Sequence, residues 1–140
     1  MRYREYGSLL TLVFKKGDKL VQQLEEFAKE KRITAASFHG LGGALLVEIG
    51  YYHLDKKEYE FTKIDEVVEI VSLHGNVALR DGEPLVHAHG VLSDANLKPY
   101  AGHIKELVVG GTCELFLQNI DDTWVRTHDE DTGLSLIDFS

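Results

Sequence analysis

The strongest structural signal in the chain is the stretch Leu85-Val86-His87-Ala88-His89-Gly90-Val91-Leu92. Its apolar and β-branched residues predict a β-strand. Because side chains alternate between the two faces of a strand, the imidazoles of His87 and His89 should project from the same face. Their Cα atoms should lie roughly 6.6 Å apart, which lets two inclined rings reach one metal ion.

This pair of histidines needs a third ligand from a neighbouring segment to make a metal site. His103, flanked by Gly102 and Ile104, is the candidate. Three neutral histidines that leave coordination positions open suit zinc, and they also suit nickel, copper, cobalt or iron. The alternative is that these histidines are partly buried and hydrogen-bonded, and line a pocket or a subunit contact.

The rest of the chain predicts an α+β fold, a mostly antiparallel sheet packed with one or two helices. Asp18 is placed to cap a helix that ends near Arg32 and whose apolar residues recur at helical spacing. The sequence Gly40-Leu41-Gly42-Gly43 predicts a sharp turn or a close backbone approach. The secondary structure of Asn96 to Val109 is ambiguous, because the segment fits either a short helix or turn, or a strand. The apolar end of the tail should dock on the body. Further strands are expected at 8–14, 33–38, 44–52, 60–64, 67–73, 76–80, 112–119 and 124–128.

Composition sets the class of protein. The 140 residues, 44% of them hydrophobic, fit a single domain over residues 1–140. A formal net charge of -8 opposes nonspecific attraction to nucleic acid, and Lys15, Lys16 and Lys19 are too few to hold duplex DNA. The single Cys113 and the absence of a long apolar run predict a cytoplasmic protein without a membrane segment.

Other candidate motifs point to no chemistry. The glycine cluster matches no phosphate-binding loop, and no cofactor-binding motif is present. Cys113 alternates with Leu115 and Leu117, a pattern that favours a buried residue over a nucleophile. The sequence cannot select a general base for metal-bound water, so no catalytic residue is assigned. The acidic residues considered for that role are Asp81, Glu83, Asp94 and Glu106.

Taken in order, five motifs of the chain resemble the plant- and prokaryote-conserved (PPC) domain, and the likeness extends over almost the whole sequence. The most specific part is the pairing of His-X-His-X-X-X-X-Asp with a downstream Gly-His. The motifs are Phe38-His39-Gly40-Leu41-Gly42-Gly43-Ala44, Ser72-Leu73-His74-Gly75-Asn76-Val77, Val86-His87-Ala88-His89-Gly90-Val91-Leu92-Ser93-Asp94, Ala101-Gly102-His103-Ile104 and Val109-Gly110-Gly111-Thr112-Cys113-Glu114.

The resemblance implies a homotrimer and a metal site formed by His87, His89 and His103, with zinc as the expected divalent ion. A small molecule or water would then take an open coordination position. Two alternatives remain: a DNA-binding regulatory module related to plant proteins that join this domain to an AT-hook, and an interaction domain with a structural metal. The chain has no Arg-Gly-Arg-Pro core of an AT-hook.

Overall fold

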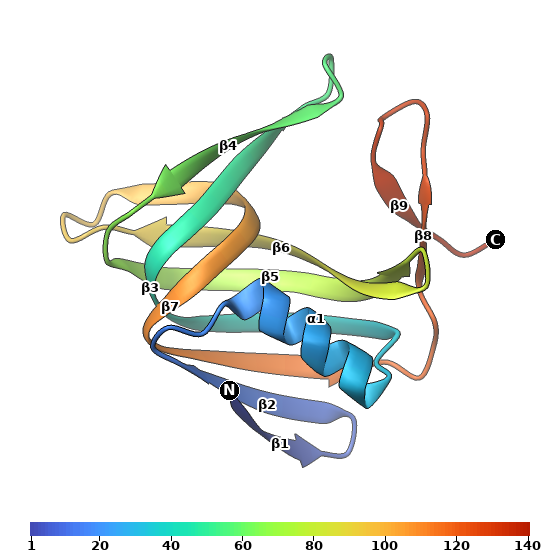
Figure 1. The fold of residues 1–140 in the computed structure, drawn as a ribbon, viewed down its shortest axis with the longest axis horizontal. Coiled ribbons are helices and arrows are strands. Elements are labelled where there is room, and N and C mark those ends of the chain that lie inside the picture. The colour runs from blue at the N-terminus through green and yellow to red at the C-terminus, as the bar shows by residue number, and fades with distance from the viewer.

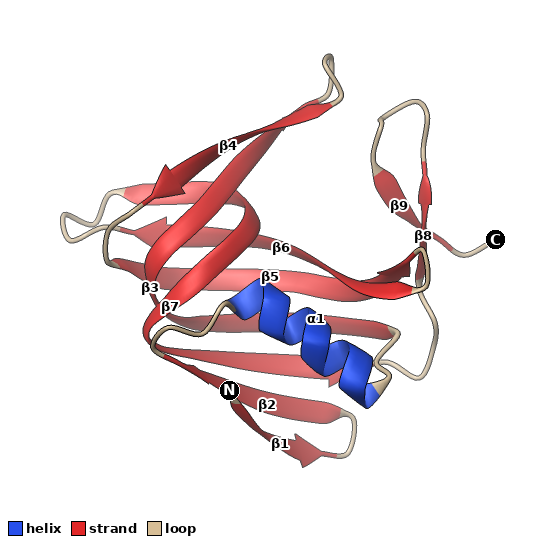
Figure 2. Ribbon diagram, viewed as in Figure 1, coloured by secondary structure: helices blue, strands red, loops and turns tan.

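The computed structural model describes residues 1–140, which form nine β-strands and one α-helix (Figures 1 and 2). All strand pairs are antiparallel except the short parallel contact between β5 and β8. The fold class predicted from the sequence is therefore confirmed. The elements are β1 (Arg2–Tyr6), β2 (Leu9–Lys15), α1 (Leu20–Lys31), β3 (Ala35–His53), β4 (Glu58–Ile64), β5 (Val68–Arg80), β6 (Glu83–Ser93), β7 (Pro99–Asn119), β8 (Val125–His128) and β9 (Ser135–Asp138).

Four of the strands form a closed ring of hydrogen-bonded neighbours. β7 pairs with β3, β3 with β5, β5 with β6, and β6 returns to the first half of β7. The second half of β7 pairs with β2 instead. β6 and residues 99–104 of β7 form a hairpin through the turn at 94–98, and this pairing closes the ring.

The helix α1 covers one side of this ring, against β6 and β7 (Figure 1). Its buried residues are those of the predicted apolar face, Leu20, Val21, Leu24, Phe27 and Ala28. They join a core cluster of 28 buried residues that includes residues from the facing strands. No helix of the structure is long and apolar enough to span a lipid bilayer.

The predicted cap at Asp18 is wrong. Helix α1 begins after Lys19, which provides no side-chain cap, and the Asp18 carboxylate instead accepts a hydrogen bond from the Lys15 N–H at 2.9 Å. The carboxylate of Glu106 on β7 accepts hydrogen bonds from the backbone N–H groups of Val21 and Gln22, at 2.8 and 3.0 Å. An acid distant in the sequence thus satisfies the free N–H groups of the first turn.

Several predicted strands are parts of longer ones. Residues 33–38 and 44–52 contribute to the single strand β3, because Gly40 to Gly43 form an irregularity in the pairing instead of a turn. A Cβ atom at Gly40 would lie 2.6 Å from the Glu114 carbonyl oxygen, so the alternative of close backbone approach holds here. The segments 67–73 and 76–80 likewise merge into β5, and the ambiguous region 96–109 enters β7.

Candidate metal centre

The register of β6 and β7 places the three predicted histidines on one surface. His87 and His89 are two residues apart on β6, and His103 lies directly opposite His89 on β7. Gly102 lets β7 approach β3 closely, since a Cβ atom at that position would lie 2.6 Å from the Gly50 carbonyl oxygen. The pleat of one strand and the pairing of the next are therefore sufficient to bring the three rings together.

The three rings form a nearly equilateral triangle. Their centroids are 5.1 Å apart for His87 and His89, 5.3 Å for His87 and His103, and 5.4 Å for His89 and His103. One nitrogen of each ring can be chosen so that all three lie within 4.8 Å of one another. Nδ1 of His103 is buried and has no hydrogen-bond partner. The geometry and this unsatisfied nitrogen both fit a divalent metal ion, because tetrahedral zinc accepts imidazole nitrogens at about 2.0–2.1 Å.

The surroundings keep these rings neutral. Burial, the charge of Arg126 and the other two histidines lower the pKa of His87 to about 4. Burial and His89 lower the pKa of His103 to about 4 as well. The pKa of His89 is also lowered, by burial and by His74. Near pH 7 all three imidazoles are therefore in the unprotonated state that a metal ion requires.

Aromatic side chains of β4 hold the ring of His103. The Tyr59 ring lies 4.7 Å from it between centroids, in a tilted arrangement, and the Phe61 ring lies 6.2 Å away. Burial raises the pKa of the Tyr59 hydroxyl, so this side chain stays neutral. These contacts restrict the orientation of the His103 imidazole.

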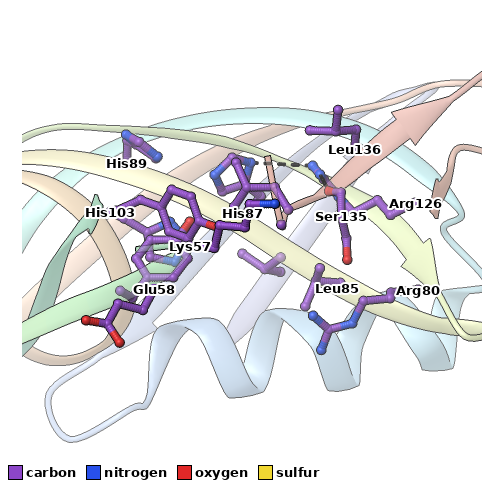
Figure 3. Close-up of a pocket in the computed structure, with 15 residues that line it drawn as sticks. Lys57, Glu58, Arg80, Leu85, His87, His89, His103, Arg126, Ser135 and Leu136 are labelled. Atoms are coloured by element: carbon purple, nitrogen blue, oxygen red, sulfur yellow. Dashed lines mark hydrogen bonds between the residues drawn. The ribbon is translucent and has the colours of Figure 1, made fainter. Parts of the chain in front are cut away.

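Arg126 of β8 reaches the opposite side of the cluster. Its Nη2 donates to Oδ1 of Asn76 at 2.8 Å. The same nitrogen lies 3.4 Å from Nδ1 of His87 (Figure 3). Its Nη1 donates to the Ser135 carbonyl oxygen at 2.7 Å. The guanidinium group is thus fixed at two points and directed at the histidines.

A cavity of about 540 Å³ opens beside the three rings. Its wall combines β6 and β7 with the β3–β4 hairpin and the C-terminal hairpin of β8 and β9 (Figure 3). Leu134 and Leu136 of the tail line the cavity, whereas Phe139 is 76% exposed, so the apolar end of the tail docks on the body only in part. The Tyr52 hydroxyl donates to the Thr132 carbonyl oxygen at 2.7 Å and joins the two hairpins. The lining residues are Tyr52, Lys57, Glu58, Tyr59, Arg80, Leu85, Val86, His87, His89, His103, Arg126, Gly133, Leu134, Ser135 and Leu136.

None of the four acids considered as a general base lines this cavity. Glu106 caps α1, Glu83 pairs with Lys29 at 2.7 Å, and Asp94 accepts backbone hydrogen bonds from Asn96 and Lys98. Asp81 lies at positive φ in the turn between β5 and β6. Glu58 is the one carboxylate of the wall, and sequence reasoning missed it together with Tyr59 and Arg126.

The remaining histidines stay outside the ligand group, as expected. His74 faces His89 across the β5–β6 pair, with ring centroids 6.5 Å apart, while His53 contacts Glu60 at 2.9 Å. Cys113 is completely buried, and burial raises the pKa of its thiol to about 12. That environment confirms a packing role and leaves no reactive thiolate.

Comparison with known proteins relates the chain to a family of domains. The model of the Plants and Prokaryotes Conserved (PCC) domain matches residues 1–121. A search of curated protein sequences gives no significant match.

Solved structures resemble the chain along nearly its whole length. A metal-containing protein from Archaeoglobus fulgidus is 37% identical, with 98% of each chain covered and a TM-score of 0.87. A plant- and prokaryote-conserved protein from Pyrococcus horikoshii is 32% identical over 98% of this chain and 94% of the other, with a TM-score of 0.88. A protein named as a candidate DNA-binding protein, from Bacteroides thetaiotaomicron, is 25% identical over 99% and 96%, with a TM-score of 0.95.

Proposed function

The chain belongs to the Plants and Prokaryotes Conserved domain family, and from this premise we propose that it binds a divalent metal ion, zinc, through His87, His89 and His103. The observation that carries the proposal is the convergence of three neutral imidazoles within 4.8 Å, at the wall of a cavity. The similarity to a metal-containing protein at 37% identity supports it.

The arrangement favours a site that works on a small molecule. A zinc ion held by the three histidines would supply Lewis acidity. The cavity beside the histidines has room for a small ligand, Tyr59 and Arg126 line it, and Glu58 is the acid on its wall. Hydrolysis or a related polar reaction on a small substrate is the reaction class that we propose.

The test is the metal content of purified protein by elemental analysis. We expect about one zinc per chain in the native protein and almost none after His87→Ala combined with His89→Ala. His53→Ala with His128→Ala removes two histidines outside the cluster and should retain the metal. Equal metal content in both double variants would reject the site, and another element in place of zinc would correct the identity of the ion.

We also propose a homotrimer, on the basis of an apolar patch across three strands. Leu41, Val71 and Val91 are 53%, 58% and 36% exposed. The pairing of Gly40 with Leu73, Gly42 with Ile70 and Ser72 with Val91 makes them neighbours on β3, β5 and β6. Sedimentation equilibrium should give three times the chain mass of 15.7 kDa, and Val71→Glu should lower that mass. A native monomer would reject the trimer.

A second candidate function is DNA binding, because a structural relative is named for it. The net charge of -8 opposes this function. If it operates, duplex DNA should bind with an affinity that decreases steeply as salt increases. No mobility shift at low salt with micromolar protein would eliminate it.

We propose the cytoplasm as the compartment, since the single Cys113 is buried and forms no disulfide.

A further inference from the structure

The cavity beside the three histidines has a charge opposite to that of the whole protein. The chain carries 15 Lys and Arg against 23 Asp and Glu. The cavity wall instead contains Lys57, Arg80 and Arg126 against the single acid Glu58. Glu58 lies at the end of the cavity away from Arg80 and Arg126 (Figure 3). The part of the cavity between the arginines and the histidines is therefore positive.

Neither arginine forms an ion pair, and the charge of Arg80 acts on Glu25 of α1, which is not part of the cavity wall. None of the ion pairs of the structure includes Arg80 or Arg126. Arg126 is half-buried, its Nε is enclosed without a hydrogen-bond acceptor, and burial and the charge of Arg80 lower the pKa of its guanidinium. An arginine remains charged even so, and a charge held away from water without a counter-ion is unfavourable. An anion in the cavity would remove this cost.

Arg126 is also prepared for recognition. Its hydrogen bonds to Asn76 and Ser135, at 2.8 and 2.7 Å, hold the guanidinium before any ligand arrives. The remaining contact, 3.4 Å to Nδ1 of His87, is too long to be strong. A ligand oxygen beside the histidines can therefore take this donor at little cost.

The other walls favour a carbon skeleton over an inorganic anion. Leu85, Val86, Leu134 and Leu136 line the same cavity, with the ring of Tyr59. A volume of about 540 Å³ is typical of a small-molecule site. Inorganic phosphate would leave these apolar groups without a partner.

We propose that the cavity binds a small organic carboxylate, with its carboxylate paired to Arg126 and supported by Arg80, and its apolar part against Leu85, Leu134 and Leu136. The inference names a ligand class for the proposed metal site and rests on that function only in placing the ligand beside the ion. Arg126 and the two C-terminal leucines lie beyond the residues 1–121 that match the family model, so this specificity comes from the C-terminal hairpin.

Calorimetric titration at low ionic strength tests the proposal, with isovalerate, its uncharged amide isovaleramide, and inorganic phosphate as probes. Each is titrated into chelator-treated and zinc-loaded protein. We expect isovalerate to bind and isovaleramide to bind at least tenfold more weakly, because the amide lacks the charge. Arg126→Gln should lower the affinity for isovalerate about 10- to 100-fold, because a charge-assisted hydrogen bond is lost.

Two further variants complete the design. Arg80 is exposed, so Arg80→Gln should leave the fold intact while it lowers the affinity for isovalerate about threefold or more. This variant keeps the test valid if Arg126→Gln is unstable. Arg4→Gln removes an equal charge from β1, away from this cavity, and should bind as the native protein does. Metal content is measured for every variant.

Equal binding by the Arg126, Arg80 and Arg4 variants would overturn the proposal, and so would binding of phosphate without isovalerate. No isovalerate binding by native protein in either metal state would overturn it too. If the native protein takes up no metal but binds isovalerate in an Arg126-dependent way, the metal site fails and the carboxylate site stands.

Discussion

His89 and His103 lie directly opposite each other on β6 and β7, with ring centroids 5.4 Å apart. His74 lies opposite His89 on its other side, on β5, at 6.5 Å. Both flanking histidines are thus cross-strand neighbours of the same residue. Only His103 belongs to the group whose nitrogens lie within 4.8 Å, so the two histidines allow a matched test of the proposed ligand against a neighbour outside the group.

Replacing His103 by Gln should therefore reduce zinc affinity, as measured by competition with a chromophoric chelator. The loss should exceed the roughly 10- to 100-fold that follows removal of residues that only support a ligand. His74→Gln should change the affinity much less, because His74 is outside the ligand group. Equal losses in the two variants would contradict the assignment of His103.

The metal-free protein should become less stable as the pH falls from about 6.5 toward 4. The folded state holds His87 and His103 with pKa values of about 4, below their ordinary value of 6.5. In this interval the unfolded chain binds protons that the folded chain does not, so acid favours unfolding. Urea denaturation with chelator present, at several pH values across this interval, measures the effect.

The variant that combines His87→Gln with His103→Gln isolates the histidine contribution. Its stability should depend less on pH than that of the native protein over the same interval, because the two groups with lowered pKa are gone. Parallel stability curves for the two proteins would refute this explanation.

Gly102→Ala should destabilise the fold and weaken metal binding together. Its Cβ would lie 2.6 Å from the Gly50 carbonyl oxygen, so β3 and β7 must separate and His103 must shift. We expect a loss of about 1–3 kcal/mol in the free energy of unfolding, by urea titration. Gly111→Ala, on the same strand, meets no atom within 4 Å and should change stability by less than about 0.5 kcal/mol. A silent Gly102→Ala would show that the strands are not closely packed there.

Glu106→Gln should destabilise the protein by about 1–2 kcal/mol, since a neutral amide accepts the helix N–H groups less strongly than a carboxylate does. The carboxylate receives hydrogen bonds from Val21, Gln22 and Leu107 at 2.8, 3.0 and 2.9 Å. Glu114→Gln, an exposed position on the same strand, should have almost no effect on thermal unfolding. Zinc content should be unchanged in both, and a loss of zinc in the Glu106 variant would return this acid to the metal site.

Local pattern was a reliable guide where the periodicity of one element decides the outcome. The helical spacing of Leu20, Leu24 and Phe27 predicted the buried face of α1. The two-residue repeat of His87 and His89 predicted their common face. Both the helix face and the strand face follow from backbone geometry alone. The glycines at 40, 42 and 43 predicted only a tight feature, since a turn and a close approach both require glycine.

The other residues of the site could not be predicted from local sequence patterns. Arg126 and Glu58 reach the cavity from two separate hairpins, and nothing in their own segments indicates a shared wall. Glu106 lies near the histidines in sequence, yet the register of β7 directs its carboxylate to α1 instead.

The sequence by itself determined the type of most elements, the common face of His87 and His89, and the family. Only the tertiary structure decided that His103 joins them, that Arg126 faces His87, and that the four suspected acids are elsewhere. The physical reason is the distance along the chain over which each effect acts. Periodicity acts over a few residues of one strand or helix, whereas closure of the ring of β3, β5, β6 and β7 depends on the packing of the whole core.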